Sequence, residues 1–521
     1  MSKFFLTTAI DYPNSRPHIG TAFEKLGADV QARYRRMEGD DVFLLMGNDE
    51  NTVKVSKRAS ELGLNTRAYC DDMVRQFREI WDALDIKYDA FIQTSSERHQ
   101  QCCRKFIQKV YDNGHIYKGK HDGWYCNGCE EFKSDKVHGE NAGNCPVHKS
   151  PLIRRSEPCY LFKLSAFSER LLKFYEEHPD FIQPESRRNE IISLIQNEGL
   201  RDVNISRQGE EWGIRIPFDP EFTIYVWFDA LLTYITGIGY GDDEATFKKY
   251  WPADIHFIGK DITRFHTALW PAMLWAADLE PPKMVFGHGF VYIKNEETGA
   301  VDKISKSLGN AIEPMDIISK FSSDAFRYYF MRECPFPGDG EFSWGRFAEV
   351  FNSELANNLG NLLSRLITIP SKNYDRVLSG TGGKAPDPVV NLDLKKFVDG
   401  VRGHVESCSY NLALQSIILD FLTPTNQYLE TNAPWKSVKT DKEAAKRVLF
   451  NAVQSLRIAS ILLKPFIPRS AKTIYESFNF PIPWEEVKYA DAAELKPQAE
   501  DLRVTAELID GKVKPLFPRI G

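Results

Sequence analysis

Short apolar runs alternate with helical patterns over the first hundred residues of this chain. Apolar runs occupy 4–9 and 41–46, and apolar residues recur at helical spacing within 19–34, 52–62 and 66–86. Because strand and helix alternate, we expect an α/β fold built on a Rossmann-like, doubly wound parallel sheet. In such a sheet, ligands bind at the carboxyl ends of the strands.

The alternation stops after these residues and resumes near residue 222. The run at 222–228 is apolar throughout and predicts a strand that returns to the sheet, 256–258 predicts a further strand, and 262–277 predicts a helix. An insertion therefore splits one nucleotide-binding fold in two. The predicted domains are the first half of the catalytic domain at 1–113, the insertion at 114–221, the second half at 222–293, a linking region at 294–351 and an all-α helical bundle at 352–521.

The insertion carries a pattern of possible metal ligands. Cys126 and Cys129 stand two residues apart, and after fifteen more residues Cys145 and His148 repeat that spacing. Two such pairs suit tetrahedral zinc, and four protein ligands close the site, so we expect one structural Zn²⁺ per chain. The alternative is that these are four unrelated core residues.

Two short stretches far apart in the sequence have the chemistry to bind phosphate. Residues 17–21 follow the first strand and open the first helix, where free N–H groups and the helix dipole attract an anion. His18 offers a hydrogen bond to phosphate, and Gly20 lets the backbone approach it closely. The second stretch, 303–309, sets two lysines and two hydroxyls in a polar loop, as a mobile phosphate clamp needs: Lys303, Ser305, Lys306 and Ser307. Each stretch alone is an ordinary solvated segment, but in this order they resemble the paired signatures of class I aminoacyl-tRNA synthetases.

Further motifs narrow the resemblance to the methionyl-tRNA synthetase family. The resemblance runs over essentially the whole chain, and the zinc-bearing insertion agrees with it. The motifs that carry it are Ala9-Ile10-Asp11-Tyr12, Tyr225-Val226-Trp227-Phe228-Asp229-Ala230, His256-Phe257-Ile258-Gly259-Lys260-Asp261-Ile262, Phe265-His266, Asn361-Leu362-Leu363-Ser364-Arg365 and Ala433-Pro434-Trp435.

The resemblance implies a site for methionine and ATP. Asp49 is implied to take the amino group, although an acidic helix cap is the alternative. Gly259 and Asp261 are implied to face the ATP ribose, and Arg207 to lie near the reacting groups. Aromatic walls suit a thioether because it is apolar and polarizable, but Trp227 or His266 taken alone is better explained as a core residue. The residues implied to line the methionine pocket are Ala9, Ile10, Tyr12, Trp227, Ala230, Tyr234, Ile262 and His266.

The implied reaction has two steps. The methionine carboxylate attacks the α-phosphate of ATP, with Mg²⁺ on the phosphates, to give methionyl-adenylate and pyrophosphate. The terminal adenosine hydroxyl of the tRNA then takes the acyl group. The enzyme positions the reactants and stabilises charge, with His18, Lys303 and Lys306 on the phosphates, so no protein nucleophile is required.

The chain reads as helical from about residue 352 almost to its end. Such a bundle usually only packs, but Asn361 and Arg365 share a helix face, and Trp435 follows Pro434 at a helix boundary. A tryptophan that stacks on a splayed base, with polar side chains on the base edges, is how single-stranded RNA is recognised. By resemblance, these residues bind the CAU anticodon of the tRNA.

Three positions depart from the family pattern. Thr21 stands where the first signature normally ends in a second histidine, Asn51-Thr52 replaces a usual His-Gly, and Ile304 replaces a usual methionine. We expect Thr21 to retain part of the phosphate stabilisation that a histidine supplies. The alternative is a threonine that only caps the helix.

Composition and segment lengths limit the remaining possibilities. The formal net charge is −6, so any RNA-binding surface is local. Nine cysteines, an odd number, favour a reducing compartment and a metal over disulfides. No apolar segment reaches membrane-spanning length and the first apolar run is too short for a signal peptide, so we expect a cytoplasmic protein. The chain stops without a basic appendage, and we expect a monomer.

Two other functions stay open on these residues. One is an amino-acid adenylating paralogue that passes its acyl group to an acceptor other than tRNA, and the retained Asn361, Arg365 and Trp435 argue against it. The other is a non-catalytic tRNA-binding relative, and the retained His18 and the lysines of 303–309 argue against that.

Overall fold

The computed structural model describes most of the chain. The described residues are 2–126, 131–133, 135–146, 149–209, 211–304, 309–378, 387–495, 502–509 and 513–520. Five predicted site residues lie outside them: Cys129, His148, Ser305, Lys306 and Ser307.

A six-stranded parallel sheet forms the centre of the catalytic domain, as predicted. Its strand order is β3-β2-β1-β12-β13-β7, and every adjacent pair runs parallel. The sequence therefore enters at the middle of the sheet and builds outward to both edges, the doubly wound topology. The strands are β1 (Lys3–Thr8), β2 (Asp41–Asn48), β3 (Ala90–Gln93), β7 (Ile182–Gln183), β12 (Ile255–Gly259) and β13 (Val285–His288).

Successive side chains of the central strands enter two different cores. Leu6 and Leu44 lie in one core with α1 and the C-terminal helices, whereas Phe5 and Leu45 lie in the other with the insertion. This alternation follows from the two-residue repeat of a strand. The helices between the strands are α1 (Ile19–Glu38), α2 (Val53–Glu61), α3 (Thr66–Ala83), α4 (Glu97–Asp112), α8 (Val226–Ala230), α9 (Thr233–Thr236), α10 (Glu244–Tyr250), η2 (Lys260–Ile262), η3 (Phe265–Leu269) and α11 (Trp270–Ala276).

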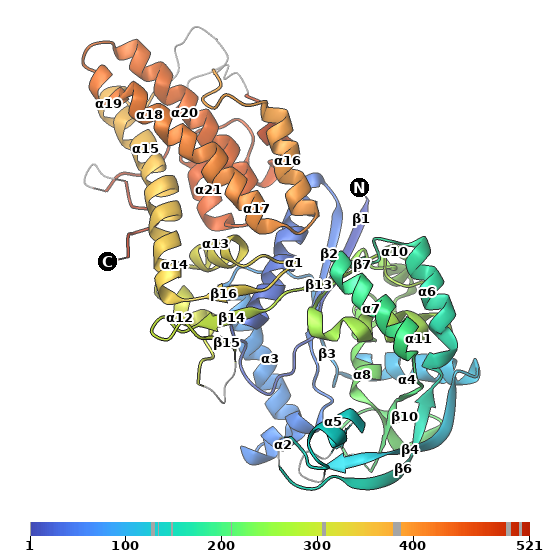
Figure 1. Cartoon of the computed structure of the whole chain (residues 1–521). Helices are drawn as coiled ribbons and strands as arrows, with labels where there is room; N and C mark the ends of the chain where they lie inside the picture. Colours follow the sequence, from blue (N-terminus) through green and yellow to red (C-terminus); the bar gives the residue numbers. More distant parts are fainter. Residues whose placement is uncertain are drawn as a thin grey trace.

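The insertion is built on antiparallel strands, and it also supplies β7 to the large sheet, where Ile182 pairs with Val285. β4 and β6 form a long antiparallel pair, and Figure 1 shows it at the end of the molecule away from the C-terminal helices. The elements are β4 (Ile116–Cys126), β5 (Glu131–Lys133), α5 (Asp135–Glu140), β6 (Ile153–Phe162), η1 (Leu164–Phe167), α6 (Ser168–Glu177), α7 (Glu185–Glu198), β8 (Val203–Asn204), β9 (Ser206–Gln208), β10 (Arg215–Ile216) and β11 (Asp219–Ile224).

The prediction of a parallel strand at 222–228 is wrong. β11 ends at Ile224 and pairs antiparallel with β9 and β10 in a separate three-stranded sheet, and α8 begins at Val226. A continuous apolar run does not distinguish a buried strand from a buried helix, because both hide every side chain. The run is therefore split between the end of one element and the start of another.

A small sheet and a set of helices follow the catalytic domain. The helices from α15 onward stand together at one end of the molecule (Figure 1), as the helical pattern from residue 352 predicts. The elements are β14 (Val291–Lys294), β15 (Val301–Lys303), α12 (Pro314–Ile318), α13 (Ser323–Glu333), β16 (Gly340–Phe342), α14 (Trp344–Val350), η4 (Phe351–Gly360), α15 (Asn361–Asn373), α16 (Leu394–Glu406), α17 (Tyr410–Gln415), η5 (Ser416–Leu422), α18 (Thr423–Asn432), α19 (Pro434–Ser437), α20 (Lys442–Leu463), α21 (Pro468–Glu476), η6 (Trp484–Glu486) and η7 (Tyr489–Ala493).

Arg327 of α13 ties the catalytic domain to these helices. It is fully buried, and its guanidinium contacts the Asp29 carboxylate of α1 at 2.7 Å. It also donates to the carbonyl oxygens of Pro465 and Phe466, just past α20, at 2.9 and 2.7 Å. One side chain thus fixes α1, which begins at the predicted phosphate site, against the helical bundle.

None of the helices in the described segments is both long and apolar enough to cross a membrane.

Candidate active site

His18 is the N-cap of α1. Its Nδ1 accepts a hydrogen bond from the Thr21 N–H at 3.2 Å, and Thr21 Oγ1 lies 3.5 Å from the same nitrogen. Because Nδ1 accepts, the proton of a neutral His18 ring is on Nε2. The side chain that caps the helix is His18, so the alternative that Thr21 is the cap is wrong.

Ile304, of the second predicted phosphate-binding stretch, lies against the first stretch at Gly20. A Cβ placed on Gly20 would lie 3.2 Å from Ile304 Cδ1, so the loop after β15 sits directly against the start of α1. The Ile19 N–H donates to the Ile312 carbonyl at 3.0 Å, and Arg16 forms an ion pair with Glu313 at 3.0 Å. These contacts hold Ile304 on one side, and Ile312 and Glu313 on the other, against the N-terminal end of α1.

Gly259 and Asp261 lie at the carboxyl end of β12. A Cβ on Gly259 would come within 2.7 Å of Asp261 Oδ1, so a larger residue there would displace that carboxylate. Lys260 forms an ion pair with Asp339 at 2.7 Å and lies over the Phe290 ring, as does Lys303, whose Nζ is 5.7 Å from the ring centroid. The predicted ribose residues and the first lysine of 303–309 thus share one region.

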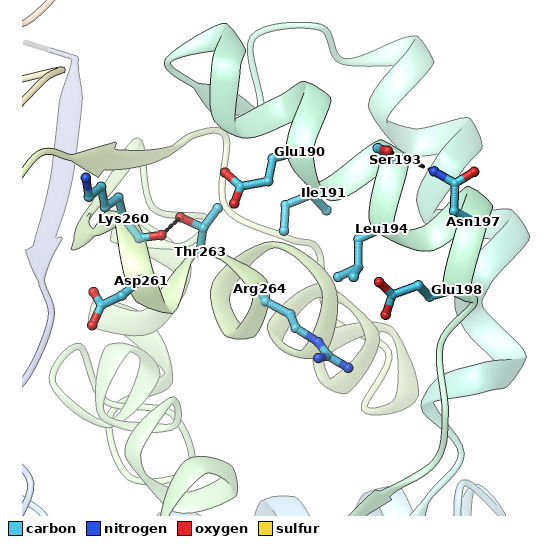
Figure 2. A pocket seen from close by; sticks show the side chains of 10 residues that line it. All are labelled: Glu190, Ile191, Ser193, Leu194, Asn197, Glu198, Lys260, Asp261, Thr263 and Arg264. Carbon is cyan, nitrogen blue, oxygen red and sulfur yellow. Dashed lines mark hydrogen bonds between the residues drawn. The ribbon is translucent and has the colours of Figure 1, made fainter. Parts of the chain in front are cut away.

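The segment after β12 also borders a cavity of about 370 Å³. Figure 2 shows its lining, which comes from this segment and from α7: Glu190, Ile191, Ser193, Leu194, Asn197, Glu198, Lys260, Asp261, Thr263 and Arg264. The α7 side chains belong to the insertion, so the insertion lies directly against the predicted nucleotide site.

Aromatic side chains gather between α8 and η3. The Trp227 and Phe265 rings stack with centroids 3.8 Å apart, and Tyr234 Oη lies 2.7 Å from His266 Nε2. His266 Nδ1 is 3.1 Å from the Ile262 carbonyl, which can only accept, so Nδ1 carries the proton and the Tyr234 hydroxyl donates to Nε2. Burial lowers the pKa of His266 to about 4, so this ring is neutral at pH 7. The result is an apolar, uncharged wall.

The residues after β1 form a short strap beside β2. Asp11 pairs with Asn48, the Asp11 N–H donates to the Gly47 carbonyl at 3.1 Å, and the Asp49 N–H donates to the Asp11 carbonyl at 2.8 Å. The strap thereby sets Ala9, Ile10 and Tyr12 next to the end of β2. The Tyr12 ring is 39% exposed, so it stands at the rim of the site rather than in the core. Ala230, at the end of α8, is buried.

Lys25 of α1 binds both the backbone and a side chain of this strap. It is buried, its Nζ donates to the Ala9 carbonyl at 2.8 Å, and it forms ion pairs with Asp11 at 3.1 Å and with Glu24 at 2.6 Å. Glu24 in turn contacts His288 Nε2 at 2.9 Å. The sequence reasoning missed this network. The available signal was a pair of adjacent charges, Glu24 and Lys25, inside an otherwise core-facing helix.

Two carboxylates lie buried at the bottom of the site. Asp49 and Asp229 are 4% and 0% exposed, and burial, followed by nearby negative charge, raises the pKa of both well above the ordinary value. Asn51 Nδ2 donates to Asp229 Oδ2 at 3.0 Å. Asp229 belongs to a quoted motif but had no predicted role, and its signal was a single carboxylate in an apolar run.

Arg207 of β9 lies with its guanidinium 4.8 Å from the centroid of the Tyr225 ring. Tyr225 is the N-cap residue of α8, so Arg207 stands beside the element that carries Trp227 and Asp229.

The predicted anticodon residues come together in the helical domain. The Arg365 guanidinium is 5.3 Å from the centroid of the Trp435 ring, and Arg365 forms an ion pair with Glu430 at 2.5 Å. Asn361 begins α15 one helical turn before Arg365, and Pro434 begins α19. Asn358 and Asn426 border a cavity of about 300 Å³ beside Arg365.

The two described residues of the predicted zinc pattern also come together. Cys126 and Cys145 are buried in one small cluster with Leu152. Within the described residues no group of three or more histidine, cysteine, aspartate or glutamate side chains is placed to hold a metal.

Comparison with known proteins agrees with this geometry. The family model described as tRNA synthetases class I (M) matches residues 4–152 and 142–367, and the model for the anticodon binding domain of methionyl tRNA ligase matches 386–510. A methionine–tRNA ligase from Caldanaerobacter subterraneus subsp. tengcongensis is 40% identical over 93% of this chain and 76% of its own length. One from Nostoc sp. is 38% identical over 99% of this chain and 97% of its own length.

The fold agrees as well. The structure of Mycobacterium tuberculosis methionyl-tRNA synthetase in complex with methionyl-adenylate superposes with a TM-score of 0.86 at 33% identity, and the match covers 100% of both chains. With two family models that together span most of the sequence, and relatives matched over nearly its whole length, the chain belongs to the methionyl-tRNA synthetase family of class I tRNA synthetases.

Proposed function

We propose that this chain joins L-methionine to tRNA through a methionyl-adenylate intermediate. The observation that carries the proposal is the contact of Ile304 with Gly20, because it supports a site in which the stretch 303–309 works at the N-terminus of α1. The full-length likeness to a synthetase bound to methionyl-adenylate supports the same chemistry.

ATP, with its Mg²⁺, would lie with its phosphates at the N-terminus of α1. His18 presents an Nε2 proton there because Nδ1 is occupied by the Thr21 N–H. The Thr21 hydroxyl, 3.5 Å from His18 Nδ1, would lie beside the phosphates and supply a second, neutral donor. Lys303, Ser305, Lys306 and Ser307 would close over the phosphates and stabilise the charge that develops during transfer. Gly20 and Gly259 allow close approach, and Asp261 takes the ribose hydroxyls.

Methionine would lie between the strap and the aromatic wall. Its carboxylate must reach the α-phosphate. Arg207 would meet these reacting groups, and its position beside Tyr225 at the start of α8 supports that role. The thioether would contact Trp227, Tyr234 and the neutral His266 ring, since an apolar, polarizable group prefers such a surface. The remaining pocket residues would be Ala9, Ile10, Tyr12, Ala230 and Ile262, with Asp49 on the ammonium group.

The tRNA would be read at the helical domain. We propose that Trp435 stacks on a base of a CAU anticodon while Asn361 and Arg365 bind base edges, with Pro434 fixing the turn. The position of Arg365 against the Trp435 ring supports a shared base-binding surface. Base stacking of this kind contributes about 1–3 kcal/mol per base.

We also propose one structural Zn²⁺ in the insertion, held by Cys126, Cys129, Cys145 and His148. The donor set fits, because Cys126 and Cys145 are both buried in one cluster and soft thiolates suit zinc. When bound, the ion would cross-link the Cys126–Cys129 pair to the Cys145–His148 pair and stabilise the fold of this part of the insertion. We place this enzyme in the cytoplasm, in keeping with its nine cysteines, and we propose that it acts as a monomer.

The test is a pair of assays on the purified chain. Methionine-dependent ATP–pyrophosphate exchange reports activation, and acylation of a tRNA with a CAU anticodon, compared with the same tRNA after anticodon replacement, reports transfer. We expect both activities, with acylation reduced by the replacement. Exchange without acylation would identify an adenylating paralogue with another acceptor. Binding of tRNA without exchange would identify a non-catalytic relative.

A further inference from the structure

Asp49 and Asp229 are two neighbouring buried carboxyl groups that, in the described segments, each lack a hydrogen-bond partner on one oxygen. Both are at least nine-tenths buried, and Oδ1 of each has no hydrogen-bond partner among the described residues. Buried polar atoms are normally paired, and an unpaired one is costly. Two such atoms in one place therefore indicate a group that is supplied from outside.

Asn51 fixes both carboxylates without neutralising them. Its backbone N–H donates to the Asp49 carboxylate, and its Nδ2 donates to Asp229 Oδ2 and to the Thr94 carbonyl, each at 3.0 Å. A single neutral residue thus bridges the two acids. Each acid keeps Oδ1 for another donor.

Among the described residues, the groups that act on Asp49 or Asp229 bring no positive charge. Glu50 adds a negative charge beside Asp49, and burial raises the pKa of Tyr12 and Tyr234, so both hydroxyls are neutral at pH 7. Across α4, burial lowers the pKa of His99 to about 3 and raises the pKa of Cys103 well above its ordinary value, so both are neutral as well. Neither acid forms an ion pair with a lysine or arginine in the described part of the chain, and a cationic ligand would meet this need.

The chemistry selects an ammonium group over a metal ion. Metals in proteins ordinarily require at least three ligands, and the described residues contain no group of three placed for one. An alkylammonium has three N–H donors, which two carboxylate oxygens and one further acceptor satisfy. Tyr12 and Tyr234 of the predicted methionine pocket are near enough to feel the charge of Asp49.

We propose that Asp229 is the second carboxylate of the α-ammonium site, where it binds the amino group of methionine together with Asp49, and that Asn51 is the positioning residue for both. This rests on the proposed function, since the ligand is its amino-acid substrate. This role explains Asn51 at a position where the family usually has a histidine. Asn51 donates hydrogen bonds to Asp49 and Asp229 but is neutral, so the positive charge at the site comes from the substrate ammonium group.

The test compares two ligands that differ only in the ammonium group. Affinities for L-methionine and for 4-(methylsulfanyl)butanoate, its deaminated analogue, are measured by calorimetry on the full chain and on Asp229→Asn, Asn51→Ala and Asp324→Asn. Asp324 is a buried carboxylate of α13 and serves as the matched control. Melting temperatures report folding.

We expect Asp229→Asn to weaken methionine binding about 10- to 100-fold while leaving the affinity for the analogue unchanged or higher. Asn51→Ala should shift the same ratio by a smaller factor, and it decides the matter if Asp229→Asn does not fold. Asp324→Asn should leave the ratio unchanged. Equal losses for both ligands, or an unchanged methionine affinity, would overturn the ammonium role. If the wild type itself lacks methionine-dependent pyrophosphate exchange, the proposed function fails and this site fails with it.

Discussion

Replacement of Arg327 by methionine should strongly destabilise the chain. The guanidinium is fully buried and has four partners: the Asp29 carboxylate at 2.7 Å, and the carbonyl oxygens of Leu84, Pro465 and Phe466 at 3.2, 2.9 and 2.7 Å. Methionine fills most of the volume but donates to none of them. The variant therefore leaves one buried carboxylate short of a cation and three carbonyls short of a donor.

The expected loss is about 3–5 kcal/mol, the usual effect of removing one partner from a buried ion pair. The loss of unfolding free energy should lie toward the lower end of this range, because Asp29 keeps its ion pair with Arg33 at 2.7 Å. The assay is urea-induced unfolding followed by circular dichroism. Arg346→Met is the matched control, since Arg346 is 45% exposed in its ion pair with Glu333 and should contribute under about 1 kcal/mol. Equal losses for the two variants would refute the view that Arg327 joins the domains.

The remaining predictions concern single sites. Trp435→Ala should leave pyrophosphate exchange intact and weaken tRNA acylation by about 1–3 kcal/mol, and equal loss in both assays would make Trp435 a packing residue. Cys126→Ser should lose the one zinc that elemental analysis finds per wild-type chain, and a metal-replete wild type without zinc would exclude the site. Thr21→Ala should slow exchange beyond any change in melting temperature, because it removes the hydroxyl beside His18 Nδ1 while the backbone N–H that the ring accepts stays in place. Burial raises the pKa of Asp11 from 3.8 to about 6. The contribution of Asp11 to the free energy of unfolding is therefore present below about pH 4 and is lost as pH rises to about 6. Unfolding measured at several pH values should show a smaller loss of stability over this range in Asp11→Asn.

The sequence predicts the centre of the fold well. The alternation of apolar runs with helical patterns, from Phe4 onward, correctly predicts the parallel sheet, because each strand is short, apolar and bounded by turns. Two strands escaped prediction or were misplaced. β7 has only two residues, too few for any periodic signal. In the run at 222–228 the polar Thr223 lies inside β11, so no residue marks where β11 ends and α8 begins.

Site residues that belong to a sequence motif can be predicted from the sequence. Residues whose role depends on being buried beside distant parts of the chain cannot. Gly20 and the lysine loop are predicted to meet because both belong to recognised signatures. Nothing local predicts that Lys25 is buried under the strap, or that Asn51 bridges two acids from different elements. These roles depend on contacts between residues as much as 178 positions apart, which no pattern in a single sequence records.

The central claim is that this chain activates methionine at the site formed by the two stretches that meet at Gly20. The most direct measurement is the initial rate of methionine-dependent ATP–pyrophosphate exchange by the wild type and by His18→Ala, with each of the other amino acids in turn as a control. We expect exchange with methionine alone, and a loss of about 100-fold or more in His18→Ala, the usual effect of removing one donor to the transition state. A wild type that exchanges equally without methionine, or a His18→Ala variant of full activity, would contradict it.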